Sequence, residues 1–175
     1  MNVWLTGFMG AGKTTTGRRL ARILCVPFAD TDAEIEREHG AIAGIFETAG
    51  ESRFRALETS VIAALGNGAA KVIAVGGGAV VSASNRALMR AHGAIVHLSI
   101  SPAGAYARVA HRSHRPLLGS EPELATIERV MIARADAYAD CDYRVSVDGK
   151  GPASVAHIIA RWYRRKTVTP HSNAR

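Results

Sequence analysis

The sequence predicts an α/β fold in which a five-stranded parallel sheet is flanked by helices. Short apolar runs rich in β-forming residues alternate with longer amphipathic segments, a pattern typical of parallel strands joined by crossover helices. A glycine-rich segment follows the first apolar run directly and opens a helical pattern. The chain has 175 residues, 47% of them apolar, which is enough for one hydrophobic core but short for two. We therefore expect a single domain over residues 1–166.

The elements follow from the position of each apolar run. The five predicted strands are Asn2–Thr6, Val26–Ala29, Lys71–Val75, Ala94–Ser99 and Tyr143–Val147. The predicted helices are Lys13–Leu24, Glu51–Leu65, Ser84–Ala91, Pro102–Ala110, Glu123–Ala139 and Pro152–Arg165, with a shorter helical region between Asp32 and Thr48. The irregular segment 111–122 mixes Arg, His, Gly and Pro and is predicted to form a mobile lid. Residues 167–175 are predicted to be a disordered tail.

The charge balance favours an anionic small molecule as the ligand. The chain carries 22 basic and 15 acidic residues, for a net charge of +7. The basic residues are scattered along the chain with no nucleic-acid-binding motif, so we expect no nucleic-acid partner. Cys25 and Cys141 belong to no metal-binding or disulfide pattern. No signal segment or membrane-spanning run is apparent, so we expect a cytoplasmic protein with no membrane partner.

The segment GFMGAGKT, residues 7–14, has the GxxxxGK[ST] pattern of a phosphate-binding loop. Small residues let backbone N–H groups approach phosphate oxygens, and the helix that begins there adds a favourable dipole. We expect Lys13 to contact the β- and γ-phosphates and the Thr14 hydroxyl to bind Mg²⁺. The loop residues predicted to bind the nucleotide are Gly10, Ala11, Gly12, Lys13, Thr14 and Thr15. The sequence therefore predicts a nucleoside triphosphate ligand.

Two features of P-loop hydrolases are missing from this sequence. Many of them carry an Asp at the end of a second apolar strand, but here the run VIAV is followed by Gly76, Gly77 and Gly78. The Asn-Lys-x-Asp segment that reads guanine in GTPases is absent as well. A carboxylate near the metal must therefore come from another part of the chain.

Several polar clusters stand where a small kinase would bind a second substrate. The segment Asp30-Thr31-Asp32 follows the second predicted strand, although Asp at such a place is also an ordinary helix cap. Glu51, Arg55 and Glu58 fall on one helical face, which taken alone is a surface ion-pair ladder. The glycine triplet could be a simple turn, and Arg115 and Arg134 could be solvated. No single cluster identifies the acceptor.

Taken together, these clusters resemble the shikimate kinase family. The resemblance runs from Asn2 to about Arg165 and includes GFMGAGKTTTGRRLA, FADTDAEIE, IFETAGESRFRALE, VIAVGGGAV, RPLL and the segment from Arg134 to Tyr138. Several linked motifs are far more specific than a phosphate-binding loop alone. The resemblance implies a P-loop kinase fold and transfer of the γ-phosphoryl group of ATP to the 3-hydroxyl of shikimate, a step of chorismate and aromatic amino acid biosynthesis.

The resemblance also implies a role for each acceptor-side residue. Asp32 would accept a hydrogen bond from the shikimate hydroxyls and act as base or orienting group. Arg55 and Arg134 would hold the substrate carboxylate, for which a planar guanidinium is a bidentate match. Gly77 would contact the ring hydroxyls through its backbone.

On the donor side, Mg²⁺ is the implied cofactor and ATP the co-substrate. Asp30 joins Thr14 in the metal site, and Lys13 and Arg115 stabilise charge on the transferring group. Glu58 is expected to orient Arg55 rather than touch substrate. Contacts to adenine are expected near residues 150–152, with no role assigned to a single side chain. ATP and shikimate are the expected ligands, bound by a monomer.

Three alternatives remain open at the level of sequence. A kinase of the same architecture could act on another small polyol acid such as gluconate, with a different acceptor pocket. A catalytically silent homologue could bind only nucleotide or a protein partner, although Lys13, Asp32 and Arg134 are all present. A nucleic-acid-binding ATPase is supported by the basic charge alone.

Overall fold

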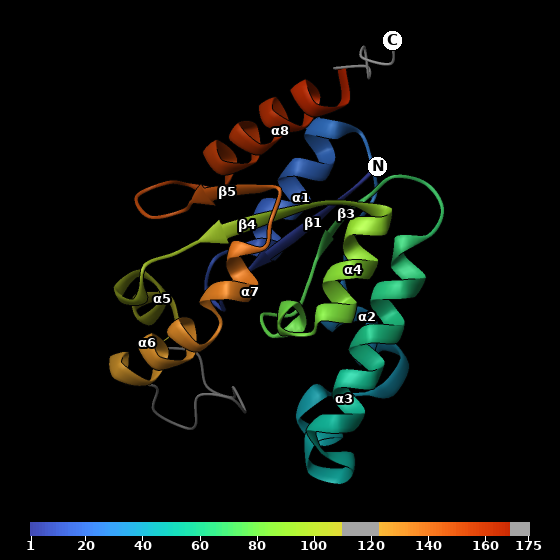
Figure 1. Ribbon diagram of the computed structural model, residues 1–175, viewed down its shortest axis with the longest axis vertical. Coiled ribbons are helices and arrows are strands. Elements are labelled where there is room, and N and C mark those ends of the chain that lie inside the picture. Colours follow the sequence, from blue (N-terminus) through green and yellow to red (C-terminus); the bar gives the residue numbers. More distant parts are fainter. Residues whose placement is uncertain (110–122, 169–175) are drawn as a thin grey trace.

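The computed structural model describes residues 1–109 and 123–168 and contains one sheet of five parallel strands (Figure 1). The strand order is β2-β3-β1-β4-β5, so β1 is the central strand. The strands are β1 Asn2–Gly7, β2 Phe28–Asp30, β3 Val72–Ala74, β4 Gly93–Ser99 and β5 Tyr143–Ser146. The predicted five-stranded parallel sheet is confirmed. Its boundaries differ from the predicted ones by at most two residues.

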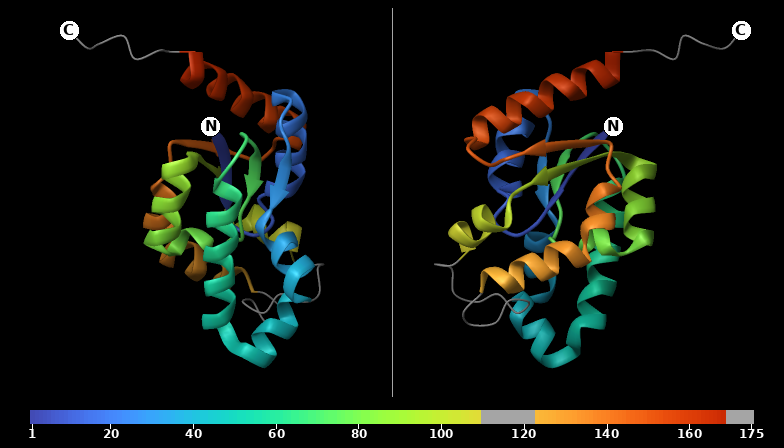
Figure 2. Two further views of the ribbon diagram at one scale, coloured as in Figure 1. Left: turned by 90° about the vertical axis from the view of Figure 1, so that its right-hand side faces the viewer. Right: turned by 60° about the vertical axis from the view of Figure 1, so that its left-hand side comes forward.

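Helices cover both faces of the sheet (Figure 2). On one face α1 packs against α8, and on the other α4 packs beside α3, with α7 next to the short 3-10 helix η1. The bounds are α1 Lys13–Leu24, α2 Thr31–His39, α3 Ile42–Gly66, η1 Ala79–Val81, α4 Ala83–His92, α5 Pro102–Val109, α6 Leu124–Ala133, α7 Ala135–Ala139 and α8 Pro152–Val168. No helix in the described ranges is long and apolar enough to cross a lipid bilayer.

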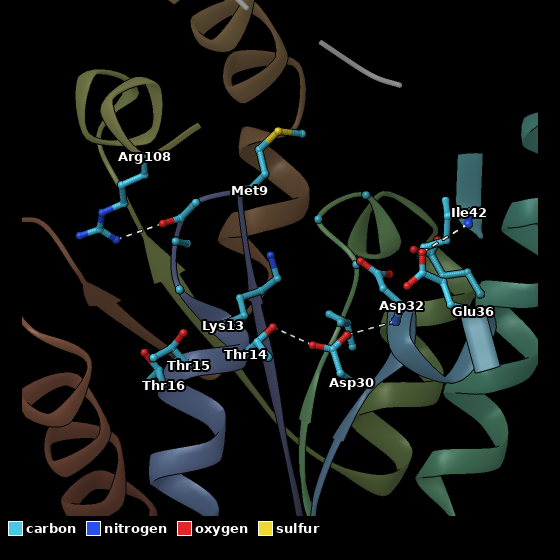
Figure 3. Close-up of a pocket in the computed structure, with 18 of the residues that line it drawn as sticks. Met9, Lys13, Thr14, Thr15, Thr16, Asp30, Asp32, Glu36, Ile42 and Arg108 are labelled. Atoms are coloured by element: carbon cyan, nitrogen blue, oxygen red, sulfur yellow. Dashed lines mark hydrogen bonds between the residues drawn. The ribbon is translucent and has the colours of Figure 1, made fainter. Parts of the chain in front are cut away.

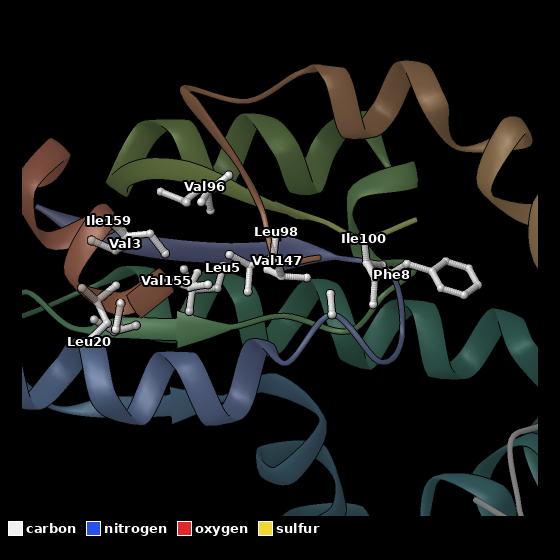
Figure 4. Close-up of a cluster of buried hydrophobic side chains, with 14 of the residues drawn as sticks. Val3, Leu5, Phe8, Leu20, Val96, Leu98, Ile100, Val147, Val155 and Ile159 are labelled. Carbon is white, nitrogen blue, oxygen red and sulfur yellow. The ribbon is translucent and has the colours of Figure 1, made fainter. Parts of the chain in front are cut away.

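Strand β1 divides the core between the two faces because side chains alternate along a strand. Val3 and Leu5 are buried in the cluster shown in Figure 4, together with residues of α1 and α8. Trp4 points to the opposite face, where it packs with Ile73 and Ile95 of the neighbouring strands. The central strand is thus buried on both sides, which explains why its sequence is a continuous apolar run rather than an alternating one.

One predicted helix is divided in the structure, and another is joined to the helical segment before it across a backbone kink. The helix predicted over Glu51–Leu65 belongs to α3, which begins at Ile42 and is interrupted at Gly50, where φ is 75°. The helix predicted over Glu123–Ala139 is two helices, because Arg134 leaves helical geometry with φ −109° and ψ 4°. The predicted start at Glu51 agrees with the interruption at Gly50. Periodicity did not reveal the interruption at Arg134, because both flanking segments keep helical spacing.

The C-terminal helix also extends further than expected. Helix α8 ends at Val168, two residues into the segment that was predicted to be a disordered tail. The Thr167 hydroxyl donates to the Tyr163 carbonyl at 3.0 Å, which holds a side chain against the last helical turn. Residues 169–175 and the predicted lid, 111–122, lie outside the described residues.

Candidate active site

A cavity of about 980 Å³ opens beyond the carboxyl ends of β1, β2 and β3. In an open parallel sheet this edge is where ligands bind, because the loops that follow the strands gather there. Every predicted site residue that the structure describes lines this cavity: Gly10, Ala11, Gly12, Lys13, Thr14, Thr15, Asp30, Asp32, Arg55, Gly77 and Arg134. The predicted site residue Arg115 lies outside the described residues.

The loop after β1 has the backbone conformation that a phosphate site needs. Gly10 and Gly12 have φ of 80° and 82°, values that residues with a side chain rarely adopt. Helix α1 begins at Lys13, and no side chain in the described ranges caps the helix at Gly12. The first N–H groups of the helix are therefore available to an anion. The Lys13 ammonium donates to the Gly7 carbonyl at 2.9 Å, which holds its charge over the loop.

The ends of β1 and β2 bring two oxygen ligands together (Figure 3). The Thr14 hydroxyl donates to one carboxylate oxygen of Asp30 at 2.7 Å. The other Asp30 oxygen accepts from the backbone N–H of Asp32 at 3.2 Å and caps α2. The described residues contain no cluster of three His, Cys, Asp or Glu side chains that could hold a metal. The Thr14 hydroxyl and the Asp30 carboxylate nevertheless suit Mg²⁺, because this ion keeps several waters and takes its remaining ligands from phosphates.

Two buried carboxylates face each other across Gly76. A Cβ atom at Gly76 would lie 2.7 Å from Oδ1 of Asp32 and 2.7 Å from Oε1 of Glu58. Neither oxygen has a hydrogen-bond partner within the described part of the chain. Burial raises the pKa of both carboxyl groups above their usual values. Asp30 raises the pKa of Asp32 further, and Asp32 raises that of Glu58. Glycine is required at position 76 because any side chain would displace these oxygens.

Helix α3 carries Arg55, whose guanidinium lines the cavity and is held between two carboxylates. Arg55 pairs with Glu51 at 2.9 Å and with Glu58 at 2.9 Å, and the Glu58 side chain is only 1% exposed. A Cβ atom at Gly78 would lie 2.9 Å from the Arg55 guanidinium nitrogens, so this group abuts the glycine triplet. The predicted shared helical face is therefore present, and one of its members is buried. A surface ion-pair ladder would be exposed throughout.

The break between α6 and α7 places a second guanidinium against the glycine triplet. Arg134 lies at the junction of the two helices, and its Nη1 donates to the Gly77 carbonyl at 3.3 Å. Four residues later the Tyr138 hydroxyl donates to the same carbonyl at 2.8 Å. The glycine triplet, Arg55 and Arg134 thus form one continuous wall of the cavity. The interruption of the predicted helix is what brings Arg134 to this wall.

His97 packs against Tyr138, next to this wall, and is expected to make the free energy of unfolding depend on pH. Burial, helped by Arg144 and Lys13, lowers the pKa of His97 from 6.5 to about 4. Between these values the unfolded chain binds more protons than the native one, so stability is lost as the pH falls from 6.5 to 4. We expect this group to remove roughly 2 to 4 kcal/mol of unfolding free energy over that range.

Denaturant unfolding of the His97→Gln variant at pH 7 and pH 4.5 measures this contribution. The variant should lose much less stability between the two pH values than the unmodified protein does. His157→Gln removes an exposed histidine on α8 and should leave the pH dependence unchanged. A His97→Gln variant with the same pH dependence as the unmodified protein would show that another group causes the acid sensitivity.

The cavity contains residues that the sequence did not reveal. Arg108, at the end of α5, donates to the Gly10 carbonyl at 3.0 Å and so braces the phosphate loop (Figure 3). No motif or spacing marks this residue, because its partner is 98 positions away in the chain. Lys150 and Pro152 line the same cavity at the side expected to receive adenine.

Comparison with known proteins identifies close relatives of this chain. Residues 9–164 match the sequence model of the family described as Shikimate kinase. A shikimate kinase from Geobacter sulfurreducens is 45% identical over 164 residues, which cover 93% of this chain and 91% of the relative. The structure of a shikimate kinase from Acinetobacter baumannii in complex with shikimate has a TM-score of 0.89 and 35% identity, covering 96% of this chain and 95% of that one.

A more distant neighbour shares only the fold. A gluconokinase structure from Sinorhizobium meliloti has a TM-score of 0.60 and 15% identity, with 95% of this chain and 97% of that chain covered. The architecture is therefore common to kinases of different acceptors. Discrimination between acceptors rests on the side chains of the cavity.

Proposed function

This chain belongs to the shikimate kinase family, and we propose that the cavity residues described above transfer the γ-phosphoryl group of ATP to the 3-hydroxyl of shikimate. The products are shikimate 3-phosphate and ADP. The observation that carries this assignment is the single cavity that joins a phosphate-binding loop to a wall with two guanidinium groups and a buried carboxylate. The phosphate-binding loop suits ATP, the phosphoryl donor. The wall with the two guanidinium groups suits a small hydroxylated carboxylic acid.

Arg55 and Arg134 hold the substrate carboxylate. They reach the cavity from α3 and from the α6–α7 junction, so the two guanidinium groups approach one anion from two sides. Guanidinium groups bind carboxylates in a bidentate manner, and two of them fix the orientation of the ring. Glu51 and Glu58 hold Arg55 in place before substrate arrives. Orientation of this kind lowers the barrier because the hydroxyl is already aimed at the phosphorus atom.

Asp32 is the proposed base or orienting group for the 3-hydroxyl. The hydroxyl proton passes to a carboxylate oxygen of Asp32 as the hydroxyl oxygen bonds to the γ-phosphorus. The bond from that phosphorus to the β–γ bridging oxygen breaks at the same time and leaves ADP. Burial raises the pKa of Asp32 toward the working pH, which improves a carboxylate as a proton acceptor. Its Oδ1, which has no hydrogen-bond partner among the described residues, is available to the substrate.

Lys13 and the N–H groups of the phosphate-binding loop hold the triphosphate. Thr14 and Asp30 are the residues proposed to hold Mg²⁺, which when bound neutralises charge on the β- and γ-phosphate oxygens. The direct contact between their oxygens, at 2.7 Å, supports the proposal that both bind one ion. Arg115 remains the proposed cation for charge on the transferring group, on the strength of the sequence alone.

A coupled assay of ADP release tests the acceptor. Purified protein with ATP and Mg²⁺ should release ADP much faster with shikimate than with gluconate or with no acceptor. Gluconate is the informative alternative because a gluconokinase shares the fold at a TM-score of 0.60. Equal rates with shikimate, with gluconate and without acceptor would contradict the proposed function.

Replacing Arg134 with Ala should raise the KM for shikimate by about 100-fold, because a charge-assisted contact to the substrate carboxylate is lost. The KM for ATP should stay within about twofold, since Arg134 lies on the acceptor wall. Steady-state kinetics with each substrate varied in turn measures both values. Arg129→Ala is the matched control, because Arg129 is an exposed arginine of α6 that donates to the Thr126 hydroxyl at 3.2 Å. Equal losses for both substrates would place Arg134 outside the acceptor site.

We also propose that the protein is a cytoplasmic monomer with neither a nucleic-acid nor a membrane partner. Light scattering of the purified protein at the concentrations used in the assay tests the oligomeric state. A dimer mass under those conditions would contradict the proposal.

A further inference from the structure

The backbone groups of the glycine triplet are almost all engaged by the protein itself. The Gly76 N–H donates to the Thr31 hydroxyl oxygen at 3.0 Å, and the Gly76 carbonyl accepts from the Ala79 N–H at 3.1 Å. The Gly77 carbonyl accepts from Tyr138, and the Gly78 carbonyl accepts from Val81. Of the backbone groups of the triplet, only the N–H groups of Gly77 and Gly78 have no partner among the described residues. Both glycines line the cavity.

The directions of these two N–H groups are set by the bonds on the other side of each peptide. In a planar trans peptide the carbonyl and the following N–H point in opposite directions. The Gly77 carbonyl and the Gly78 N–H share one peptide, so the Tyr138 bond directs the Gly78 N–H away from α7. The Gly76 carbonyl and the Gly77 N–H share the preceding peptide, and the Ala79 N–H holds that carbonyl. Thr31 holds the Gly76 N–H, which lies on the other side of the Gly76 Cα, and so fixes the start of the triplet.

Thr31 and Tyr138 are both buried and belong to the elements that carry the proposed acceptor residues. Thr31 is 0% exposed and directly precedes Asp32 in α2, whereas Tyr138 is 6% exposed and follows Arg134 by one turn. The Tyr138 ring packs on His97 with ring centroids 4.7 Å apart, which limits its movement. Burial also raises the pKa of Tyr138, so its hydroxyl keeps the donated proton at neutral pH.

We propose that Thr31 and Tyr138 are positioning residues whose hydroxyls hold the glycine triplet with the Gly77 and Gly78 N–H groups aimed at the acceptor substrate. This inference rests on the proposed function, because it assigns the two donors to the substrate that Asp32 and the arginines bind. Arg134 also contacts the Gly77 carbonyl, at 3.3 Å. When Arg134 turns to the substrate carboxylate, Tyr138 keeps that carbonyl in place.

Three variants test the two hydroxyls separately. Tyr138→Phe and Thr31→Val each remove one hydroxyl with little change in shape, and Thr31→Ser restores it. By calorimetry, the first two should weaken shikimate binding by roughly five- to tenfold, the cost of one buried hydrogen bond. Their affinity for ATP should be unchanged, and Thr31→Ser should bind shikimate nearly as well as the unmodified protein. Tyr163→Phe is the matched control. Tyr163 lies on α8, and its hydroxyl donates to the Met1 carbonyl at 2.8 Å.

Amide hydrogen exchange without substrate separates this proposal from the proposed function. The peptide that covers residues 76–78 should exchange faster in Tyr138→Phe and in Thr31→Val, and at the unmodified rate in Tyr163→Phe. Failure of the unmodified protein to phosphorylate shikimate would contradict the proposed function, whereas unchanged exchange would overturn the assignment of the two hydroxyls. Faster exchange with unchanged shikimate affinity would also overturn it, because the hydroxyls would then serve only local stability.

Discussion

Replacing Asp32 with Asn is expected to lower the rate of shikimate phosphorylation by about 10³-fold or more, the upper range for loss of a general base. Asn occupies nearly the same volume but cannot accept the hydroxyl proton. ATP affinity should stay within about twofold, because Asp32 reaches the cavity from α2, outside the phosphate-binding loop. Steady-state turnover and calorimetric titration with ATP measure the two quantities.

The same change should stabilise the fold. Burial raises the pKa of Asp32 in the native state, so the native protein binds this proton more tightly than the unfolded chain does. Stability is therefore present at low pH and is lost as the pH rises through the native pKa. At pH 7 Asn removes a buried charge beside Glu58, and we expect a gain of about 1 kcal/mol, or roughly 2 to 4 °C in Tm for a chain of this size.

Glu38→Gln is the matched control for Asp32→Asn, because it converts an exposed carboxylate of the same helix into an amide. Its turnover should equal that of the unmodified protein, and its Tm should not rise. Two results would count against the assignment of Asp32. One is Asp32→Asn turnover within tenfold of the unmodified protein. The other is loss of ATP binding, which would place Asp32 on the donor side of the cavity.

The second large effect is expected for Lys13→Met, which keeps the length of the side chain but removes its charge. We expect kcat/KM for ATP to fall by about 10³-fold, because stabilisation of charge on the transferring group is electrostatic and acts inside a cavity. Shikimate affinity in the absence of nucleotide should change little, since the acceptor wall does not depend on this ammonium. Kinetics with ATP varied and calorimetry with shikimate measure these values.

Lys71→Met tests whether loss of any lysine has this effect. Lys71 lies before β3 and donates to the Asn67 carbonyl, away from the residues that line the cavity. Its variant should retain full turnover. Similar kcat/KM values for Lys13→Met and Lys71→Met would remove Lys13 from the proposed mechanism. A Lys13→Met protein that also fails to bind shikimate would indicate that the ammonium supports the fold of the loop through the Gly7 carbonyl.

Two buried carboxylate oxygens in the cavity wall lower the stability of the fold. Asp32 and Glu58 each bury an oxygen without a protein partner in the described part of the chain, and an unsatisfied buried polar atom costs about 1 to 3 kcal/mol. Such costs persist where a ligand later satisfies the group. They are concentrated at Gly76, where no side chain separates the two carboxylates. The part of the wall with these unsatisfied buried oxygens is thus the part proposed to bind the acceptor substrate.

Local sequence was sufficient to predict the strands, the phosphate-binding loop and the family. Strand β1 could be predicted because burial on both faces requires an uninterrupted apolar run. The loop could be predicted because Gly10 and Gly12 must adopt positive φ and because the lysine must follow at a constant spacing. The resemblance to shikimate kinases, read from linked motifs, agrees with the family match. These features depend on residues close together in the chain.

Only the tertiary structure decided how the acceptor wall is held together. Tyr138 reaches the Gly77 carbonyl across 61 positions, and Thr31 reaches Gly76 across 45. Both residues lie in motifs that carry the family resemblance, but nothing in the local sequence indicates that their hydroxyls hold the glycine triplet. The break at Arg134 was invisible for a related reason, because both flanking segments keep helical periodicity. The sequence by itself thus determined which groups are proposed to bind phosphate, and the packing of distant helices determined where the glycine N–H groups and the two guanidinium groups lie.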